Sequence, residues 1–248
     1  MPASKSKIEK NLQRIREETD RACARSGRSA GEVLLVAVTK TADLDEVCSL
    51  VDLGVTELGE SRVQQLIQRA AELGARLRRR SNGAAAADRL RWHMVGHLQR
   101  NKVKPVLEVC NAIHSVDSLR LAEEIDARAE QAGPGGAGRR IDVLMQVNCS
   151  QEPQKFGVAV GAAAHLAELI CTLRNLRLVG LMTMAPMARN PELARPTFVR
   201  MREIFEEIRH SKTGGDDFRH LSMGMSRDYA VAVEEGATIL RIGSALFE

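Results

Sequence analysis

Aromatic residues are scarce in this sequence, at 3% of its 248 residues. Proteins that bind single-stranded nucleic acid stack bases on aromatic side chains, so such a surface is not expected here. The net charge is only +4, and the basic residues are scattered apart from the run at 78–80. A short arginine run of this kind is typical of a solvated helix end. The composition argues against nucleic acid as a partner and leaves small anionic molecules as candidate ligands.

Cysteine pairs and long apolar runs are missing as well. The five cysteines are widely spaced and form no CxxC pair, which argues against a disulfide framework and against a zinc site. No apolar run approaches the roughly 18 residues of a membrane-spanning helix. The N-terminus alternates charges where a secretory leader would be apolar. We therefore expect a cytoplasmic protein that contacts no membrane and holds no metal.

What the sequence does contain is a repeated alternation of short apolar runs with amphipathic stretches. The first run, 33–38, is rich in β-branched residues and is followed by the polar Thr39, as is typical of a buried parallel strand. Eight such units favour a single (β/α)8 TIM barrel domain spanning 1–248, with an open doubly wound sheet as the structural alternative. The expected strands are 33–38, 55–58, 90–95, 112–116, 141–147, 176–182, 219–222 and 238–242.

Two low-complexity stretches predict loops. Residues 81–88 are rich in alanine and have the appearance of an inserted loop. Residues 133–138 match the GxGxxG pattern of dinucleotide-binding proteins, but they contain Pro134 and precede an expected strand. That fingerprint follows a strand and opens a helix, so we interpret this stretch as a flexible loop.

Lys40 is the most unusual residue at an expected strand end. TIM barrels build their functional sites at the C-terminal ends of the strands. Lys40 directly follows the first apolar run, so its side chain emerges from a buried strand at the barrel mouth. A lysine in such a place suits imine formation with an aldehyde. The pattern alone is more typical of a surface lysine that opens a loop.

Glycine and serine gather after the last two expected strands. Ser222, Gly224 and Ser226 follow the seventh strand, and Gly243 and Ser244 follow the eighth. Glycines allow backbone N–H groups to approach an anion, serines add hydroxyl donors, and barrels commonly hold phosphate at these two loops. Serine and glycine are also ordinary turn residues, so only the combination predicts a split phosphate-binding cup.

His93 and His97 are spaced four residues apart, which raises the question of a zinc site. They straddle an expected strand end and lack the HExxH context of a helical zinc motif. We therefore expect His93 to be a core histidine whose ring nitrogens have hydrogen-bond partners.

Together these motifs resemble those of the pyridoxal phosphate homeostasis protein family, single-domain relatives of the alanine racemase N-terminal barrel. The resemblance implies that Lys40 holds pyridoxal 5′-phosphate as a Schiff base, with Arg241 beside the cofactor. It further implies a phosphate site in the two loops that contain Ser222, Gly224, Ser226, Gly243 and Ser244. The sequence departs from the family at Ser61, where asparagine is usual, and at Glu248, where the family usually continues with glycine. The matching stretches are 36–40, 58–64, 92–99, 221–226 and 240–244.

The resemblance leaves a choice between a cofactor carrier and a pyridoxal phosphate-dependent amino-acid racemase. Racemisation needs acid–base groups on both faces of the substrate, and in the similar racemases a tyrosine from a second domain serves one face. The sole tyrosine here, Tyr229, lies in an expected helix, and we expect no second domain. A cation such as Arg241 facing the pyridine nitrogen opposes ring protonation and weakens the ring as an electron sink.

We therefore expect a monomer that binds pyridoxal phosphate and supplies it to pyridoxal phosphate-dependent apoenzymes, with no catalytic residues. The racemase is the alternative. A plain interaction protein would not explain why Lys40 and the two glycine–serine loops occur together.

Overall fold

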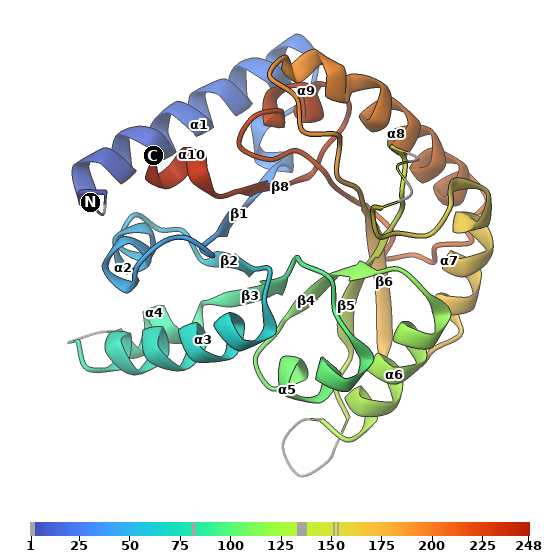
Figure 1. Ribbon diagram of the computed structural model, residues 1–248, viewed down its shortest axis with the longest axis horizontal. Coiled ribbons are helices and arrows are strands. Elements are labelled where there is room, and N and C mark those ends of the chain that lie inside the picture. Colours follow the sequence, from blue (N-terminus) through green and yellow to red (C-terminus); the bar gives the residue numbers. More distant parts are fainter. Residues whose placement is uncertain (1–2, 81–82, 133–137, 151, 153) are drawn as a thin grey trace.

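The computed structural model describes residues 3–80, 83–132, 138–150, 152 and 154–248. In this part of the chain, β1–β8 run parallel in sequence order around a closed barrel (Figure 1). The first and last strands pair with each other, with Val36 opposite Arg241. This pairing confirms the predicted TIM barrel and excludes the open doubly wound sheet. The strands are β1 (Leu34–Val38), β2 (Glu57–Glu60), β3 (Arg91–Met94), β4 (Ala112–Val116), β5 (Ile141–Gln146), β6 (Leu176–Met182), β7 (His220–Ser222) and β8 (Ile239–Ile242).

Helices surround the ring of strands (Figure 1). The first and the last helix lie side by side, where the Asn11 side-chain amide donates to the Leu246 carbonyl at 3.1 Å. None of the helices in the described ranges is long and apolar enough to span a membrane. The helices are α1 (Lys5–Arg25), α2 (Leu44–Asp52), α3 (Val63–Arg78), α4 (Gly83–Asp88), α5 (Val103–Leu107), α6 (Leu119–Glu130), α7 (Ala163–Cys171), α8 (Arg195–His210), α9 (Tyr229–Glu234) and α10 (Ser244–Phe247). Short 3-10 turns lie at η1 (Ala30–Glu32), η2 (Arg100–Lys102), η4 (Val160–Ala162) and η5 (Pro191–Ala194).

Local signals in the sequence fix several helix ends. Asp43 begins α2 with a capping box, accepting from the Glu46 amide at 2.8 Å while Glu46 accepts from the Asp43 amide at 2.7 Å. Gly27 and Gly54 follow α1 and α2 with φ of +67° and +86°, a conformation that glycine adopts without strain.

The alanine-rich stretch is where the prediction was wrong. Residues 83–88 form α4, which packs against α3. Alanine has the highest intrinsic helix propensity, and packing against a neighbouring helix stabilises even a short helix. Residues 81–82 and 133–137, which include most of the second expected loop, lie outside the described residues.

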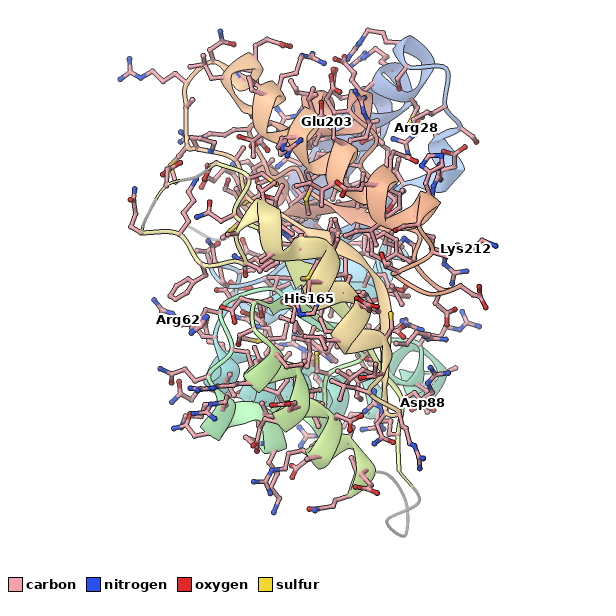
Figure 2. All side chains as sticks on the ribbon, turned by 90° about the vertical axis from the view of Figure 1, so that its right-hand side faces the viewer. Arg28, Arg62, Asp88, His165, Glu203 and Lys212 are labelled. Carbon is pink, nitrogen blue, oxygen red and sulfur yellow. The ribbon has the colours of Figure 1, made fainter. Side chains whose placement is uncertain are left out.

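The two-residue period of each strand divides its side chains between two cores. Alternate residues pack outward against the helices, and the others fill the barrel interior. The outer helix faces are polar, as His165 on α7 and Glu203 on α8 illustrate (Figure 2). The interior apolar cluster consists of Val36, Leu144, Val179, Met182 and Ile239.

Gly224, directly after β7, generates a prediction about stability. Its φ is +90°, and an added Cβ would lie 2.6 Å from the Ala232 Cβ. Gly224→Ala should therefore lower the free energy of unfolding by about 1–3 kcal/mol, the usual cost of such backbone strain. Urea unfolding followed by circular dichroism measures this change. Gly161→Ala is the control, because no atom lies within 4 Å of its added Cβ. Equal effects of the two substitutions would contradict this account of Gly224.

Candidate functional site

A cavity of about 400 Å³ opens at the C-terminal end of the barrel. Lys40, Ser226, Arg241, Gly243 and Ser244 all line it. These residues follow or end the first, seventh and eighth strands, and the closing β1–β8 pair brings them to one opening. The structure thus places five of the seven residues predicted from the sequence around one space.

Lys40 lies two residues after the end of β1, and its side chain is exposed as well as lining the cavity. The Gln65 side-chain amide donates to the Lys40 carbonyl at 3.2 Å, which ties the start of this loop to α3. The preceding Thr39 is buried and donates from its hydroxyl to Glu60 at 2.5 Å. Glu60 itself faces outward to Arg69 on α3 at 3.0 Å. The backbone around Lys40 is therefore held by contacts with α3 and β2, while the Lys40 amine remains accessible to a ligand in the cavity.

The loops after β7 and β8 are joined by the Ser226 hydroxyl. Its oxygen accepts from the backbone amides of Gly243 and Ala245, both at 3.2 Å. Two donors on one hydroxyl oxygen leave its own proton free to donate into the cavity. Asp228 holds the first loop in shape by accepting from the Met225 amide at 2.6 Å, and burial raises the pKa of this carboxyl group. The hydroxyl groups of Ser226 and Ser244 therefore lie together on one side of the cavity, next to Gly243.

Ser222 and Gly224 do not line the cavity and lie behind it. Ser222 is fully buried, and its oxygen accepts from Arg241 Nη1 at 2.7 Å. The carbonyl of Gly224 accepts from the Arg241 amide at 3.0 Å. Both residues therefore contact Arg241, and neither presents a donor to the cavity.

Arg241 is a buried cation beside the cavity. Its Nη2 donates to the Thr183 carbonyl at 2.9 Å, so two of its nitrogens bind protein atoms. Burial lowers the pKa of the guanidinium group to about 10, and the charge of Asp228 acts in the opposite direction. Arg241 therefore remains protonated at neutral pH.

The mouth of the cavity contains Phe156 and Met187, which the sequence motifs did not single out. The rings of His97 and Phe156 stack with their centroids 3.9 Å apart, and His97 Nδ1 lies 3.5 Å from Asp117. Phe156 and Met187 are exposed at 52% and 87%. Both lie in loops that match no motif, so only the fold shows that they border the site.

His93 points into the barrel, away from the cavity wall. Its ring nitrogens contact Glu57 at 2.6 Å and His114 at 2.9 Å, which confirms the expected core histidine with satisfied partners. His114 itself escaped the sequence analysis because it lies inside an apolar strand. In the described ranges, no group of three or more histidine, cysteine or acidic residues is placed to hold a metal ion.

The cavity combines three chemical features: an accessible primary amine, a set of anion-binding donors and a permanently charged buried guanidinium group. This combination suits a small anionic molecule with a carbonyl group that an amine can attack.

Comparisons with known proteins agree with this description. Residues 6–248 match the family model of the alanine racemase N-terminal domain. A pyridoxal phosphate homeostasis protein of Aquifex aeolicus is 37% identical over 95% of both chains. A crystal structure of an unknown protein from Bifidobacterium adolescentis is 38% identical with a TM-score of 0.87, covering 98% of this chain and 95% of that one.

A further solved relative carries a ligand. PipY of Synechococcus elongatus, whose structure has pyridoxal phosphate bound, is 30% identical with a TM-score of 0.75 and covers 93% of this chain and 100% of its own. Identity at this level over nearly complete chains establishes common ancestry as well as a common fold. The chain therefore belongs to the pyridoxal phosphate homeostasis protein family, whose barrel is that of the alanine racemase N-terminal domain.

Proposed function

We propose that residues 1–248 act as one domain that binds pyridoxal 5′-phosphate in the cavity and supplies it to pyridoxal phosphate-dependent apoenzymes. The observation that carries this proposal is the convergence of Lys40, Ser226, Arg241, Gly243 and Ser244 on one cavity of about 400 Å³. Ligand sites typically measure about 300–1,000 Å³, so the space fits a molecule of this size. The relatives named for pyridoxal phosphate homeostasis, and PipY with its bound cofactor, support the choice of ligand.

Each part of the cofactor has a matching group in the cavity. When bound, pyridoxal phosphate supplies an aldehyde that reacts with primary amines and a ring that can take up electrons. Lys40 would hold the aldehyde carbon through Nζ, with release of water. Ser226 and Ser244 would hold the phosphate through their hydroxyl groups, and Gly243, whose own N–H donates to Ser226, would give it room to approach the backbone. In this proposal Ser222 and Gly224 act through Arg241 and have no direct contact with the phosphate.

Arg241 and Tyr229 favour the carrier over the racemase. Arg241 stays protonated at neutral pH, so a pyridine nitrogen that meets it would remain unprotonated by like-charge repulsion. Such a ring is a poor electron sink for removal of an α-proton. Tyr229 is half-buried at the start of α9, which packs against α1, and it does not line the cavity. It is therefore not placed as the second acid–base group that a racemase needs.

The first prediction for this site concerns Lys40. Borohydride reduction of the protein with pyridoxal phosphate should fix the cofactor to the peptide that contains Lys40, because reduction converts an imine into a stable amine. Lys40→Ala should lose the label, as mass spectrometry of the digest would show. Lys155→Ala is the matched control, since Lys155 adjoins Phe156 at the cavity mouth and is paired with Glu152 at 2.7 Å. A label that persists in Lys40→Ala would overturn the assignment.

The second prediction concerns the phosphate-binding donors. A hydrogen bond to a charged acceptor contributes about 1.5–3 kcal/mol, so removing two hydroxyl groups should weaken pyridoxal phosphate binding more than tenfold. Ser226→Ala combined with Ser244→Ala tests this by titration, with unphosphorylated pyridoxal as the second ligand. Pyridoxal should bind poorly to the parent and change little in the variant. Ser61→Ala, at a serine elsewhere on the cavity wall, is the control. Equal binding of the two vitamers by the parent would place the phosphate elsewhere.

The third prediction concerns turnover. L- and D-alanine, and a panel of other amino acids, should exchange their α-protons in deuterated buffer no faster with the protein than with free pyridoxal phosphate. A positioned general acid or base contributes about 10²–10⁴-fold, and the carrier lacks the second one. Proton NMR follows the exchange. Exchange at about 1–10³ per second, abolished in Lys40→Ala, would establish the racemase instead.

A further inference from the structure

A chain of polar side chains crosses the interior of the barrel from Glu57 to Arg241. Glu57 Oε2 lies 2.6 Å from His93 Nε2, and His93 Nδ1 lies 2.9 Å from His114 Nε2. His114 Nδ1 lies 2.9 Å from the Ser222 oxygen, which accepts from Arg241 Nη1 at 2.7 Å. Four consecutive hydrogen bonds thus link the start of β2 to the cavity, and every ring nitrogen of the two histidines is used.

Strand geometry places these residues on the inner face of the barrel. Leu58, Met94, Ile113, Leu221 and Ile242 belong to the outer core against the helices. Side chains alternate along a strand. The residues next to these in the sequence, which form the hydrogen-bonded chain, therefore point inward. His93, His114, Ser222 and Arg241 are each at most 4% exposed, which shields the hydrogen bonds between them from water.

The chemistry of the groups gives the chain one direction. Burial lowers the pKa of His114 well below its usual value, and the nearby His93, Arg241 and His220 act in the same direction, so one of its nitrogens donates and the other accepts. A carboxylate at Glu57 only accepts, so a His93 ring with a single N–H donates from Nε2 and accepts at Nδ1. His114 then donates from Nε2, and its Nδ1 accepts the Ser222 proton. Arg241 has no acceptor and donates to Ser222. The groups at both ends of the hydrogen-bonded chain therefore require hydrogen bonds donated in the direction from Arg241 toward Glu57.

We propose that Glu57, His93 and His114 position Ser222 and Arg241 through this one-way chain of hydrogen bonds. Whether the side chain at position 57 only accepts or also donates a hydrogen bond then controls the orientation of Arg241 toward the cofactor. The proposal rests on the proposed function for its effect on pyridoxal phosphate. It requires the Nε2–H tautomer of both histidines, which the protein without cofactor also has to show.

Charged groups surround the hydrogen-bonded chain. Arg91 lies 3.6 Å from Glu57 and also contacts Asp142, and Arg16 and Asp20 of α1 line a smaller cavity with Glu57. His220 and Arg241 face His114, and Asp228 faces Arg241. An extra proton on His93 would make its Nδ1 a donor, and His114 would then donate from Nδ1 to Ser222.

The first test uses the protein without cofactor. Nitrogen-15 spectra of histidine-labelled protein at neutral pH should show the Nε2–H tautomer for His93 and His114. In Glu57→Gln the amide group can donate as well as accept, so both histidines should shift toward the Nδ1–H tautomer. Asp142→Asn is the matched control, because Asp142 has the same 15% side-chain exposure and also contacts Arg91. It should leave the tautomers as in the parent.

The second test adds pyridoxal phosphate. Glu57→Gln should weaken binding about two- to tenfold, the effect of one impaired hydrogen bond. It should also move the pH midpoint of the bound cofactor's absorbance to lower pH, because a negative charge is lost. Ser222→Ala cuts the chain next to Arg241, so adding Glu57→Gln to it should weaken binding no further. Asp142→Asn should bind as the parent does.

An Nδ1–H tautomer in the parent, or unchanged tautomers in Glu57→Gln, would overturn the one-way chain. Additive effects of Ser222→Ala and Glu57→Gln on binding would overturn the control of Arg241. A parent that binds no pyridoxal phosphate would refute the proposed function alone, because the spectra without cofactor still decide the direction of the chain. Should Glu57→Gln fail to fold, the tautomers of the parent and of Ser222→Ala decide it, and both proteins should show Nε2–H.

Discussion

The pairing of β1 with β8 is the constraint on which the rest of the structure depends. It places Val36 opposite Arg241 and brings both ends of the sequence to one opening of the barrel. Lys40 and the loop that begins at Gly243 can line a common cavity only because the sheet is closed in this register. In a closed barrel of parallel strands all C-terminal ends point the same way, so one opening collects the ends of every strand.

Closure also creates an interior that must be filled, and this protein fills part of it with polar groups. A buried guanidinium group is costly unless its donors are bound, and Arg241 binds Ser222 and the Thr183 carbonyl. The histidines and Glu57 continue these bonds, so every neighbour along the chain has a partner. A polar network satisfied in this way fixes side-chain positions, whereas the same groups left unpaired would destabilise the fold.

The walls of the cavity differ in polarity. The hydroxyl groups of Ser226 and Ser244 provide anion-binding donors, while Phe156 and Met187 leave apolar surface exposed at the mouth. An exposed Lys40 between these walls is reachable by a ligand entering from solvent. The proposed release of the cofactor would need such access.

The sequence by itself determined the order of the elements and much of their extent. The strands expected at 112–116 and 176–182 have these bounds in the structure, because β-branched runs and flanking turn residues are local signals. The motifs also placed Lys40, Ser226 and Gly243 at strand ends, where the barrel gathers them. The short α4 was missed because its alanines carry no apolar periodicity and its packing against α3 is not a local property.

Only the tertiary structure decided which of the site residues face the cavity. Ser222 and Ser226 look alike in the sequence, yet one binds Arg241 behind the cavity and the other lines it. The difference is the inward direction of the last β7 side chain, which depends on register with β6 and β8. The role of His114 could likewise be identified only in the tertiary structure, because the residues it contacts, His93 and Ser222, lie on other strands. Contacts between distant segments are set by how the sheet closes, which no local pattern encodes.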